Sequence, residues 1–519
     1  MKKLFTLLIS ATLVFWSCGV DFNETKVPVN TTLPLADFNI SESMLLSWGG
    51  VKEDILSRGD DDILQIRKSQ EIEIGSSADL KDLFNISNQK FLIPYNFGGI
   101  VPAPIEININ PIIKLSHNFV FEDNYTISNA TLNNGEISFN VLNTVSDFKN
   151  VSCTIEQLTK NNNPLVIKSG ETISLAGYEL KLDNKSTLNF YLSGKISAKA
   201  GDNLSNINLN IAFSNLEILQ AKGFFGRKEI NPVNEFTINI DPSIIDFFKD
   251  CDYYLNNPQI KLQLSNAYNL PILVKISKLK IGDKEIKLKD GIGNSTILLK
   301  PEYITDYVLN NSSTLGGKEL SEAISSNISS CTIAFTIITN PTKEDIGDAA
   351  YIAPTTNAIA LNKSIKIQED LLIPFDGMFT NVAFNQEFNM DLDNSNGNIY
   401  EYLKLGITCA NEMPLNLNFT LVAVSNDNTE SILLEEPVNI PASNGLRPAS
   451  PNFKAGIIDN ANAIIRTIPG EKVQAMITAK TLKFVFKGSM PKQANGEYSK
   501  LYSPSSLNLK LIGNLKGEF

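Results

Sequence analysis

The sequence predicts a mainly β protein, made of tandem β-sandwich-like domains with a few short helices. Polar and apolar residues alternate along several runs, and a period of two places one face of a strand in a core and the other in water. Clusters of Asn, Gly and Pro separate the runs, and these residues favour turns because Asn and Gly tolerate positive φ and Pro fixes φ. The alternating runs include 105–109, 186–192 and 206–211, and the turn clusters include 133–135, 161–164 and 256–258.

Composition narrows the function classes. The chain has 519 residues, which is room for roughly three domains. Nucleic-acid binding needs clustered cationic charge, but 45 Lys and Arg stand against 56 Asp and Glu with no basic block, so we expect no nucleic-acid partner. The single histidine, His117, argues against a multi-histidine metal centre and against a histidine-based catalytic triad.

The N-terminus has the pattern of a secretory signal. Met1–Lys3 supplies a short cationic region, and an almost wholly apolar run follows from Leu4 to Trp16. Such a run fits a signal peptide and is shorter than the roughly 20 residues that a membrane-spanning helix needs. No later segment reaches that length, so we predict a signal peptide at 1–17 and a soluble body after it.

The end of this signal, Ser17-Cys18-Gly19, resembles a bacterial lipobox. The resemblance implies that Cys18 becomes the acylated first residue of the mature chain, which would bind the protein to a bilayer through its acyl chains. Phe15 stands where a lipobox usually has Leu, a looseness similar to Bacteroidota lipoproteins. Gly19 in place of Asp favours the outer membrane, with the membrane face left open. An ordinary signal peptide with an incidental Cys18 is the alternative.

Helix signals are few and short. A capping residue and an apolar stripe, or Pro at the first helical position, predict helices over 77–84, 241–248, 301–308 and 318–324. We divide the chain into the signal peptide at 1–17, an N-terminal region with short helices and strands at 18–115, a β-sandwich domain at 116–232, a β-rich domain with short helices at 233–375, and a C-terminal β-sandwich domain at 376–519.

An internal echo suggests duplication. Residues 261–277 and 404–420 share a pattern of strand, Pro-containing turn and strand, aligned without a gap at an offset of 143. We interpret each copy as a hairpin that closes a sandwich. Convergence of two unrelated hairpins remains the alternative, because alternation is a generic pattern.

With the segments 33–35, 175–178 and 223–226, the echo makes the chain similar to large β-rich envelope lipoproteins of Bacteroidota. Its hairpin pattern also resembles late-embryogenesis-type and fibronectin-like sandwiches. The resemblance implies a cell-envelope location and a β fold, and it brings no catalytic residue.

The best candidate for a metal site is weak. Asp391, Asp393 and Ser395 place hard oxygen ligands close together, as Ca²⁺ prefers. An EF-type loop starting at Asp391 would need Gly at position 396 and Glu at position 402, where this chain has Asn and Tyr. We therefore favour a polar turn between strands, and we predict neither a metal nor another cofactor.

Other constellations also favour structural interpretations. Arg58-Gly59-Asp60 spells an integrin-binding tripeptide, but we interpret it as a solvated acidic turn. Four cysteines lie far apart in the sequence, and isolated buried thiols are the favoured interpretation, with disulfide pairing left open. They are Cys153, Cys251, Cys331 and Cys409.

These observations lead to one functional hypothesis and two alternatives. We predict a lipid-anchored protein of the cell envelope, palmitate-modified and not an enzyme, with a structural role or one in binding an envelope protein or glycan. Loop residues of tandem sandwiches commonly carry such binding. The alternatives are a glycan-directed envelope hydrolase using carboxylates distant in sequence, and a carrier that encloses an apolar ligand in a cavity.

Overall fold

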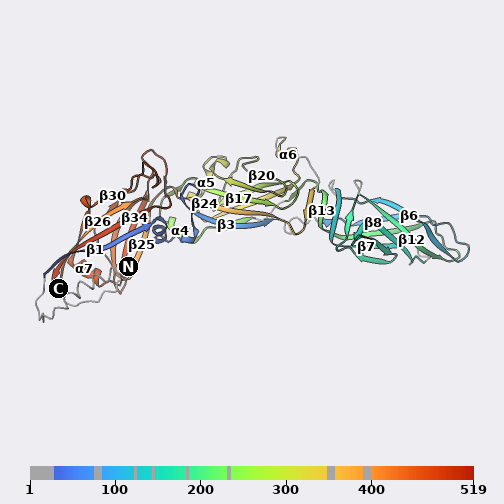
Figure 1. The fold of residues 1–519 in the computed structure, drawn as a ribbon, viewed down its shortest axis with the longest axis horizontal. Helices are drawn as coiled ribbons and strands as arrows, with labels where there is room; N and C mark the ends of the chain where they lie inside the picture. The colour runs from blue at the N-terminus through green and yellow to red at the C-terminus, as the bar shows by residue number, and fades with distance from the viewer. Residues whose placement is uncertain are drawn as a thin grey trace.

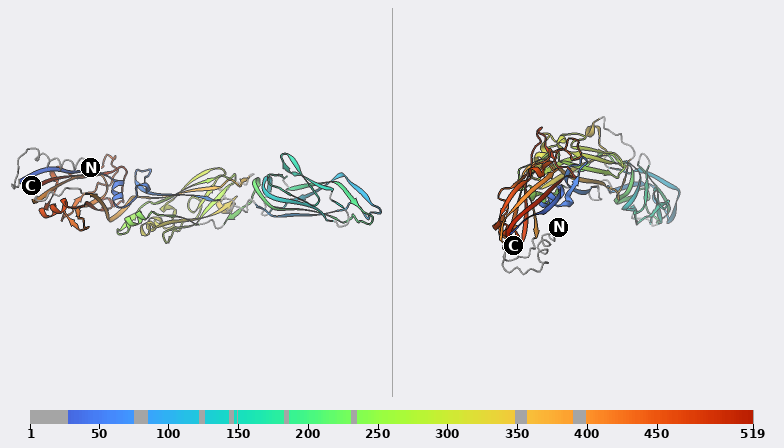
Figure 2. Two further views of the ribbon diagram at one scale, coloured as in Figure 1. Left: turned by 90° about the horizontal axis from the view of Figure 1, so that it is seen from below. Right: turned by 60° about the vertical axis from the view of Figure 1, so that its left-hand side comes forward.

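The protein is described here by a computed structural model, which places three β-units in a row (Figure 1). The fold is mainly β with antiparallel sheets and few short helices, so the predicted fold class is confirmed. The molecule is extended when seen from below and bent when turned about the vertical axis (Figure 2). The described residues are 28–74, 85–121, 126–142, 147–148, 150–182, 186–230, 235–347, 357–389 and 399–518.

The unit at the left of Figure 1 contains strands from near both ends of the described chain, and we call it the proximal unit; the middle and distal units follow to its right. These are β1 (Pro28–Ser41), β16 (Tyr253–Leu255), β25 (Asp376–Asn389), β26 (Ile399–Asn411), β27 (Asn416–Val424), β28 (Glu430–Ile432), β29 (Val438–Ile440), β30 (Gly456–Ile458), β31 (Ile464–Pro469), β32 (Thr481–Met490), β33 (Ser499–Lys500) and β34 (Ser506–Glu518). One sheet has the order β1-β34-β26-β30, with β31 also on β26. The second has the order β16-β25-β32-β27-β28, with β29 on β27 and β33 on β25. Phe38 of the first sheet packs on Phe388 and Phe484 of the second, with ring centroids 6.0 and 5.2 Å apart, so a packed core joins the sheets.

The middle unit is a second pair of sheets. Its strands are β2 (Leu56–Arg58), β3 (Leu64–Ile74), β14 (Lys228–Ile230), β15 (Phe236–Asn239), β17 (Gln259–Asn266), β18 (Ile272–Ile281), β19 (Lys284–Glu285), β20 (Thr296–Leu299), β21 (Ile304–Leu309), β22 (Ser330–Thr339) and β24 (Ile365–Pro374). One sheet has the order β2-β3-β24-β17-β21. The other has the order β14-β22-β18-β19, with β15 on β22 and β20 on β18.

The distal unit is one 11-stranded sheet that curves around its core. Its strands are β4 (Asn85–Ile86), β5 (Gln89–Tyr95), β6 (Ile105–Asn118), β7 (Thr126–Leu142), β8 (Val151–Lys160), β9 (Asn163–Lys168), β10 (Glu171–Ser174), β11 (Glu179–Lys181), β12 (Thr187–Ala198), β13 (Ile207–Phe224) and the later β23 (Asn357–Ala360). The curvature brings Phe91 of β5 onto Phe190 of β12, with ring centroids 5.5 Å apart, although these strands are not neighbours in the sheet.

Short helices connect the sheets: α2 (Glu42–Trp48), α4 (Pro242–Phe248), α5 (Glu319–Ser326), α6 (Lys343–Ile346), α7 (Gly470–Ile477) and the 3₁₀ turns η1 (Glu53–Ile55), η2 (Asn311–Ser313) and η3 (Asn460–Asn462). Two expected helices are present as α4 and α5, and α4 begins at Pro242 after an Asp241 cap, as predicted. The helix expected over 301–308 is wrong, since residues 301–302 form a turn and the segment from Ile304 onward lies in β21. The helix expected over 77–84 lies outside the described residues. No helix in the described ranges is long and apolar enough to cross a membrane.

The three units are nested along the chain. It leaves the proximal unit after β1, passes through the middle unit, builds most of the distal unit, and returns through the middle unit to add β16 to the proximal unit. It then builds more of the middle unit, adds β23 to the distal unit, and returns through β24 to complete the proximal unit. The segment expected as an N-terminal region, 18–115, therefore supplies strands to all three units. The boundaries expected after 232 and 375 lie close to the passages between units, after Phe224 and Pro374. Independent folding of these segments as domains stays a prediction.

The internal echo corresponds to a repeated corner between sheets. Asn266 ends β17 and Asn411 ends β26, and each precedes a strand of the facing sheet, so the connection is an arch and the expected hairpin is wrong. In each corner the Asn side chain accepts a hydrogen bond from the backbone N–H two residues on and donates to the carbonyl four residues on. The structural offset is therefore 411 − 266 = 145, two residues more than the sequence alignment indicated.

The proximal and middle units share more than this corner. Strand β26 pairs with β34 on one side and with β30 and β31 on the other, and β17 pairs with β24 on one side and β21 on the other, all antiparallel. Helix α7 precedes β32 as α5 precedes β22, and these strands pair with β27 and β18. One topology thus occurs twice in the chain, which favours duplication over convergence.

Aromatic packing couples the middle unit to the proximal one. The ring of Phe247, in α4, lies with its centroid 6.5, 6.4 and 6.0 Å from those of Phe375, Phe379 and Phe384. Helix α4 follows a strand of the middle unit and precedes β16 of the proximal unit, so these contacts fix the passage between them.

Candidate functional site

Two sets of residues singled out in the sequence lie outside the described chain. Cys18, the expected lipidation site, belongs to 1–27, and Asp391, Asp393 and Ser395, the weak metal candidate, belong to 390–398. Lipid anchoring and the polar-turn interpretation therefore stay predictions.

Arg58 of the integrin-like tripeptide is engaged inside the molecule. Its guanidinium pairs with Asp62, whose carboxylate also pairs with Arg447 of the proximal unit. Asp60 is highly exposed, with its carboxylate 3.5 Å from Lys261 Nζ. The segment therefore forms part of the contact between the middle and proximal units, in keeping with a structural turn.

His117 and the cysteines are packed residues. The His117 ring lies against Phe91 and Phe190, with centroids 5.9 and 6.4 Å away. All four cysteines are free thiols, and Cys153, Cys331 and Cys409 are buried while Cys251 is half-buried. Burial raises the pKa of Cys153 to about 12, which makes the reactive thiolate scarce.

One buried carboxyl stands out in the middle unit. Glu369 on β24 is completely buried and faces the opposite sheet, where Cys331 Sγ lies 3.9 Å from its Oε1. Gln70 Nε2 donates to the other carboxyl oxygen at 2.7 Å. Burial raises the pKa of Glu369 to about 7, because desolvation penalises the charged form. Both carboxyl oxygens contact side chains of the same sandwich, so we assign Glu369 a structural role.

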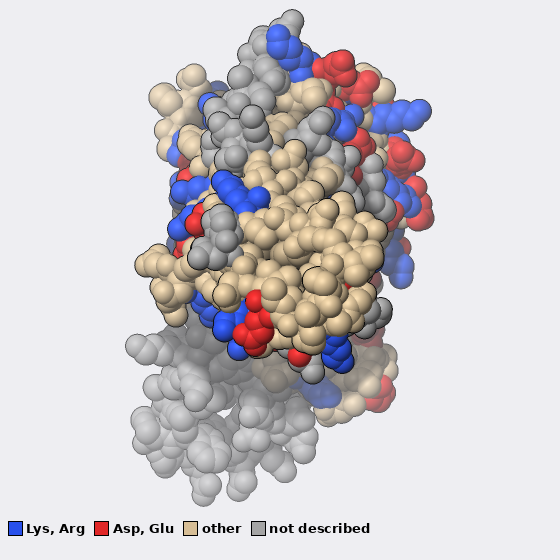
Figure 3. Space-filling view, turned by 90° about the vertical axis from the view of Figure 1, so that its right-hand side faces the viewer, with Lys and Arg blue, Asp and Glu red and all other residues tan. Residues whose placement is uncertain are grey.

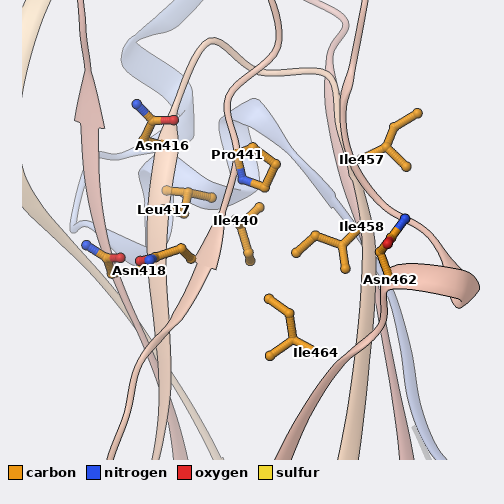
Figure 4. A pocket seen from close by; sticks show the side chains of 10 residues that line it. Asn416, Leu417, Asn418, Ile440, Pro441, Ile457, Ile458, Asn462 and Ile464 are labelled. Atoms are coloured by element: carbon orange, nitrogen blue, oxygen red, sulfur yellow. The ribbon is translucent and has the colours of Figure 1, made fainter.

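A pocket of about 600 Å³ opens at the side of the proximal unit, where the edges of its two sheets face each other. Strands β27 and β29 bound it on one sheet, and β30 and the start of β31 on the other. Leu417, Ile440, Ile458 and Ile464 point toward a common space from these strands (Figure 4). Pro441 and Ile457 complete the apolar part of the wall.

Uncharged amides form the rest of the lining: Asn416, Asn418, Asn439 and Asn462. All four are exposed, and none of the ten described lining residues is charged. Asn416 Oδ1 accepts a hydrogen bond from the Ala442 N–H at 3.0 Å. The wall thus suits an uncharged, mainly apolar group with a few hydrogen-bonding atoms.

Two hydrogen bonds cross between the sheets on either side of the pocket. Asn411 Nδ2 donates to the Pro441 carbonyl at 2.8 Å, and Arg466 Nε donates to the Glu436 carbonyl at 3.2 Å. Each bond links a side chain of one sheet to a backbone carbonyl beside the other sheet, so the two bonds fix the distance between the sheet edges at the pocket.

Sequence reasoning did not find this pocket, although one signal was available. Ile457-Ile458 and Ile464-Ile465 are apolar at adjacent positions and so break the alternation of a half-buried strand. Ile457 and Ile465 are each 63% exposed, which leaves apolar surface beside the opening. Two aromatic side chains of the described chain, Tyr254 and Phe225, are engaged inside the molecule, since Tyr254 stacks on Tyr498 and Phe225 is fully buried.

Comparisons with known proteins find only distant structural similarity. No family model matches the chain, and no curated protein matches it. A candidate secreted protein from Parabacteroides distasonis is similar at 14% identity and a TM-score of 0.26, over 55% of this chain and 82% of that one.

Two viral structures show weaker similarity. A chain from the structure of Sulfolobus turreted icosahedral virus has 11% identity and a TM-score of 0.12. A chain from a structure of the triple jelly roll fold and turret assembly of an archaeal virus has 9% identity and a TM-score of 0.11. Both matches cover 86% of this chain and 95% of the other. At such TM-scores the similarities carry no argument about fold or function.

Proposed function

We propose that the protein is a lipid-tethered β-rod of the bacterial outer membrane, which is anchored through Cys18 and works by binding or as a structural spacer. The pairing of β1 with β34 supports this proposal most directly. Their register begins with Pro28 opposite Glu518, at the end of the proximal unit remote from the middle unit (Figure 1). Pro28 lies 28 − 18 = 10 residues after Cys18, so a tether there would hold this end at the bilayer.

The nested path of the chain places the distal unit at the end of the molecule opposite to the proposed tether. The distal unit is built from mid-chain residues and lies at the opposite end of the molecule (Figure 1). A rod held at its base would therefore carry the distal unit away from the membrane, where loops and sheet edges meet partners.

The end face of the distal unit supports a binding role. A broad area without charged side chains faces the viewer in Figure 3, with charged residues around it. Exposed apolar side chains belong to this unit, including Ile100 at 71%, Ile105 at 52% and Leu142 at 50% exposure. An uncharged surface in a unit that carries exposed apolar side chains is a feature that supports the binding of another macromolecule.

Metabolic labelling with radioactive palmitate tests the anchor in cells. We expect label on the wild-type chain and none on Cys18→Ser, with the wild type in the outer-membrane fraction. Cys251→Ser is the matched control, because it removes a half-buried thiol of the body and should retain the label. Label on Cys18→Ser, or an unlabelled wild type, would overturn the proposal.

A further inference from the structure

The proximal pocket has a counterpart in the middle unit that the chain itself occupies. Taking Asn266 and Asn411 as equivalent, Ile272 and Leu417 each lie six residues later. Ile272 pairs with Leu299, and Leu417 pairs with Ile440 of the pocket wall. The first wall of the pocket is therefore built in the same register in both units.

The second wall has different side chains in the two units, and the largest difference lies at one position. Leu262 and Ile407 each lie four residues before the corner asparagine. Leu262 pairs with Tyr307, whereas Ile407 pairs with Ile464. Tyr307 in the middle unit is thus the counterpart of Ile464 in the pocket.

Tyr307 closes the edge of the middle unit. Its hydroxyl donates to the carbonyl of Asn294, which precedes β20 on the facing sheet, so the half-buried ring spans the gap between the sheets. Burial of the ring raises its pKa to about 12, so the phenol stays protonated as a donor. Isoleucine at position 464 has neither the ring nor the hydroxyl to make this bridge.

The connections also differ in length. Residues 300–303 join β20 directly to β21, whereas residues 441–455 separate β29 from β30, and η3 interrupts the edge before β31. The shorter side chain and the longer connection together leave the proximal edge open where the middle edge is filled.

We infer that the proximal pocket binds an aromatic side chain of a partner polypeptide, presented on an extended segment, in the place that Tyr307 takes in the middle unit. The repeat supplies the shape argument, since the same register accommodates a tyrosine ring elsewhere in this chain. The uncharged lining suits a phenol or phenyl ring. The recess of about 600 Å³ has room for one ring beside Ile464.

An extended segment fits the frame of the opening. Strands β29 and β30 are each three residues long and lie at the edges of their sheets, where an added strand can pair with backbone groups. Asn462, which lies beside Ile458 at the rim (Figure 4), can hydrogen-bond to the backbone of such a segment or to a phenol hydroxyl. This inference does not depend on the lipid anchor and goes beyond it.

Binding of two synthetic peptides to the purified full-length chain tests the inference. One is a capped pentapeptide of Thr and Val with a central Tyr, and the other has Ala at that position. We expect calorimetry to give at least about tenfold tighter binding of the Tyr peptide, which corresponds to about 1.4 kcal/mol. Equal affinities, or no binding of the Tyr peptide at millimolar concentration, would overturn the inference.

Variants locate the binding. Ile464→Tyr should fill the pocket as Tyr307 fills the equivalent place in the middle unit. We expect it to weaken binding of the Tyr peptide at least about tenfold and to keep the melting temperature at or above that of the wild type. The control Ile465→Tyr places the same ring at the adjacent, 63% exposed position and should bind like the wild type. Ile457→Asp adds a charge at an exposed wall residue without touching the core, and should also weaken binding. Wild-type affinity in both Ile464→Tyr and Ile457→Asp would place the peptide elsewhere and refute the site.

Discussion

Asn266 and Asn411, 145 residues apart, make the same local hydrogen bonds in two different sandwiches. Each accepts from the N–H two residues later at 3.0 Å and donates to the carbonyl four residues later at 2.8 Å. Each also donates to a carbonyl of the facing sheet's edge connection, at Lys300 and Pro441. A buried amide so completely paired fixes the arch and thereby the alignment of the two sheets.

Replacing Asn411 by Ala should destabilise the proximal unit by about 2–3 kcal/mol. The substitution leaves one N–H and two carbonyl groups without this partner, and unpaired buried groups cost about 1–3 kcal/mol. Urea unfolding followed by the fluorescence of Trp48 would measure the change, since this indole stacks on Phe486 of the proximal core.

Asn416→Ala provides the matched control for that experiment. This exposed asparagine makes one hydrogen bond, to the N–H of Ala442, and its removal should cost less than about 1 kcal/mol. If Asn411→Ala lowered the free energy of unfolding no more than Asn416→Ala does, the Asn411 amide would not be what holds the corner.

The buried carboxyl of Glu369 should make stability depend on pH. Its pKa is raised from 4.5 to about 7 in the folded protein, so the folded state binds a proton that the unfolded state releases. This contribution to stability is fully present below pH 4.5 and is lost as the pH rises through 7. The difference of pKa corresponds to on the order of 3 kcal/mol.

Glu369→Gln should therefore raise the free energy of unfolding at pH 8 and flatten its dependence between pH 5 and 8. The amide is uncharged at every pH and keeps an oxygen for Gln70. Glu71→Gln on the neighbouring strand is the control, because Glu71 forms an exposed ion pair with Lys366 and should change little. Parallel pH profiles for wild type and Glu369→Gln would disprove the buried-charge account.

Local patterns predicted local structure well. The Asp241-Pro242 start of α4 was predictable because the cap and the proline act within one turn, and the Asp241 side chain does accept from the Ser243 N–H. The helix expected over 301–308 is absent because residues from Ile304 onward pair with β17, and this long-range contact overrides the local helical pattern.

Pairing between distant segments was not accessible from the sequence. Nothing local in 28–41 indicates a partner at 506–518, yet that pairing defines the base of the rod. The pocket was missed for a related reason. Ile464 alone does not indicate a pocket, because the indication comes from comparing it with Tyr307. The two residues are counterparts only when the repeats are aligned at an offset of 145 residues instead of 143. A two-residue shift preserves strand alternation, so periodicity could not detect the error.

Substitution of Gly49 by Ala would test the packing between the middle and proximal units. It ends α2 with φ −81°, a backbone conformation open to Ala, so the substitution causes no backbone strain. A Cβ there would lie 2.7 Å from Cε2 of Phe247, and this ring is confined by Phe248, Phe375, Phe379 and Phe384. The ring cannot withdraw without disturbing that cluster, so Gly49→Ala should destabilise the protein by about 1–3 kcal/mol.

The control is Gly99→Ala, where a Cβ would meet no atom within 4 Å and the change should lie within about 0.5 kcal/mol. Reduced freedom of the unfolded chain favours Ala over Gly by about 0.4–1 kcal/mol at any compatible site. The two substitutions share this gain, so the difference between their urea midpoints isolates the steric cost at Phe247. Equal midpoints would mean that the aromatic cluster has room to move, and that the passage through α4 does not hold the middle and proximal units in register.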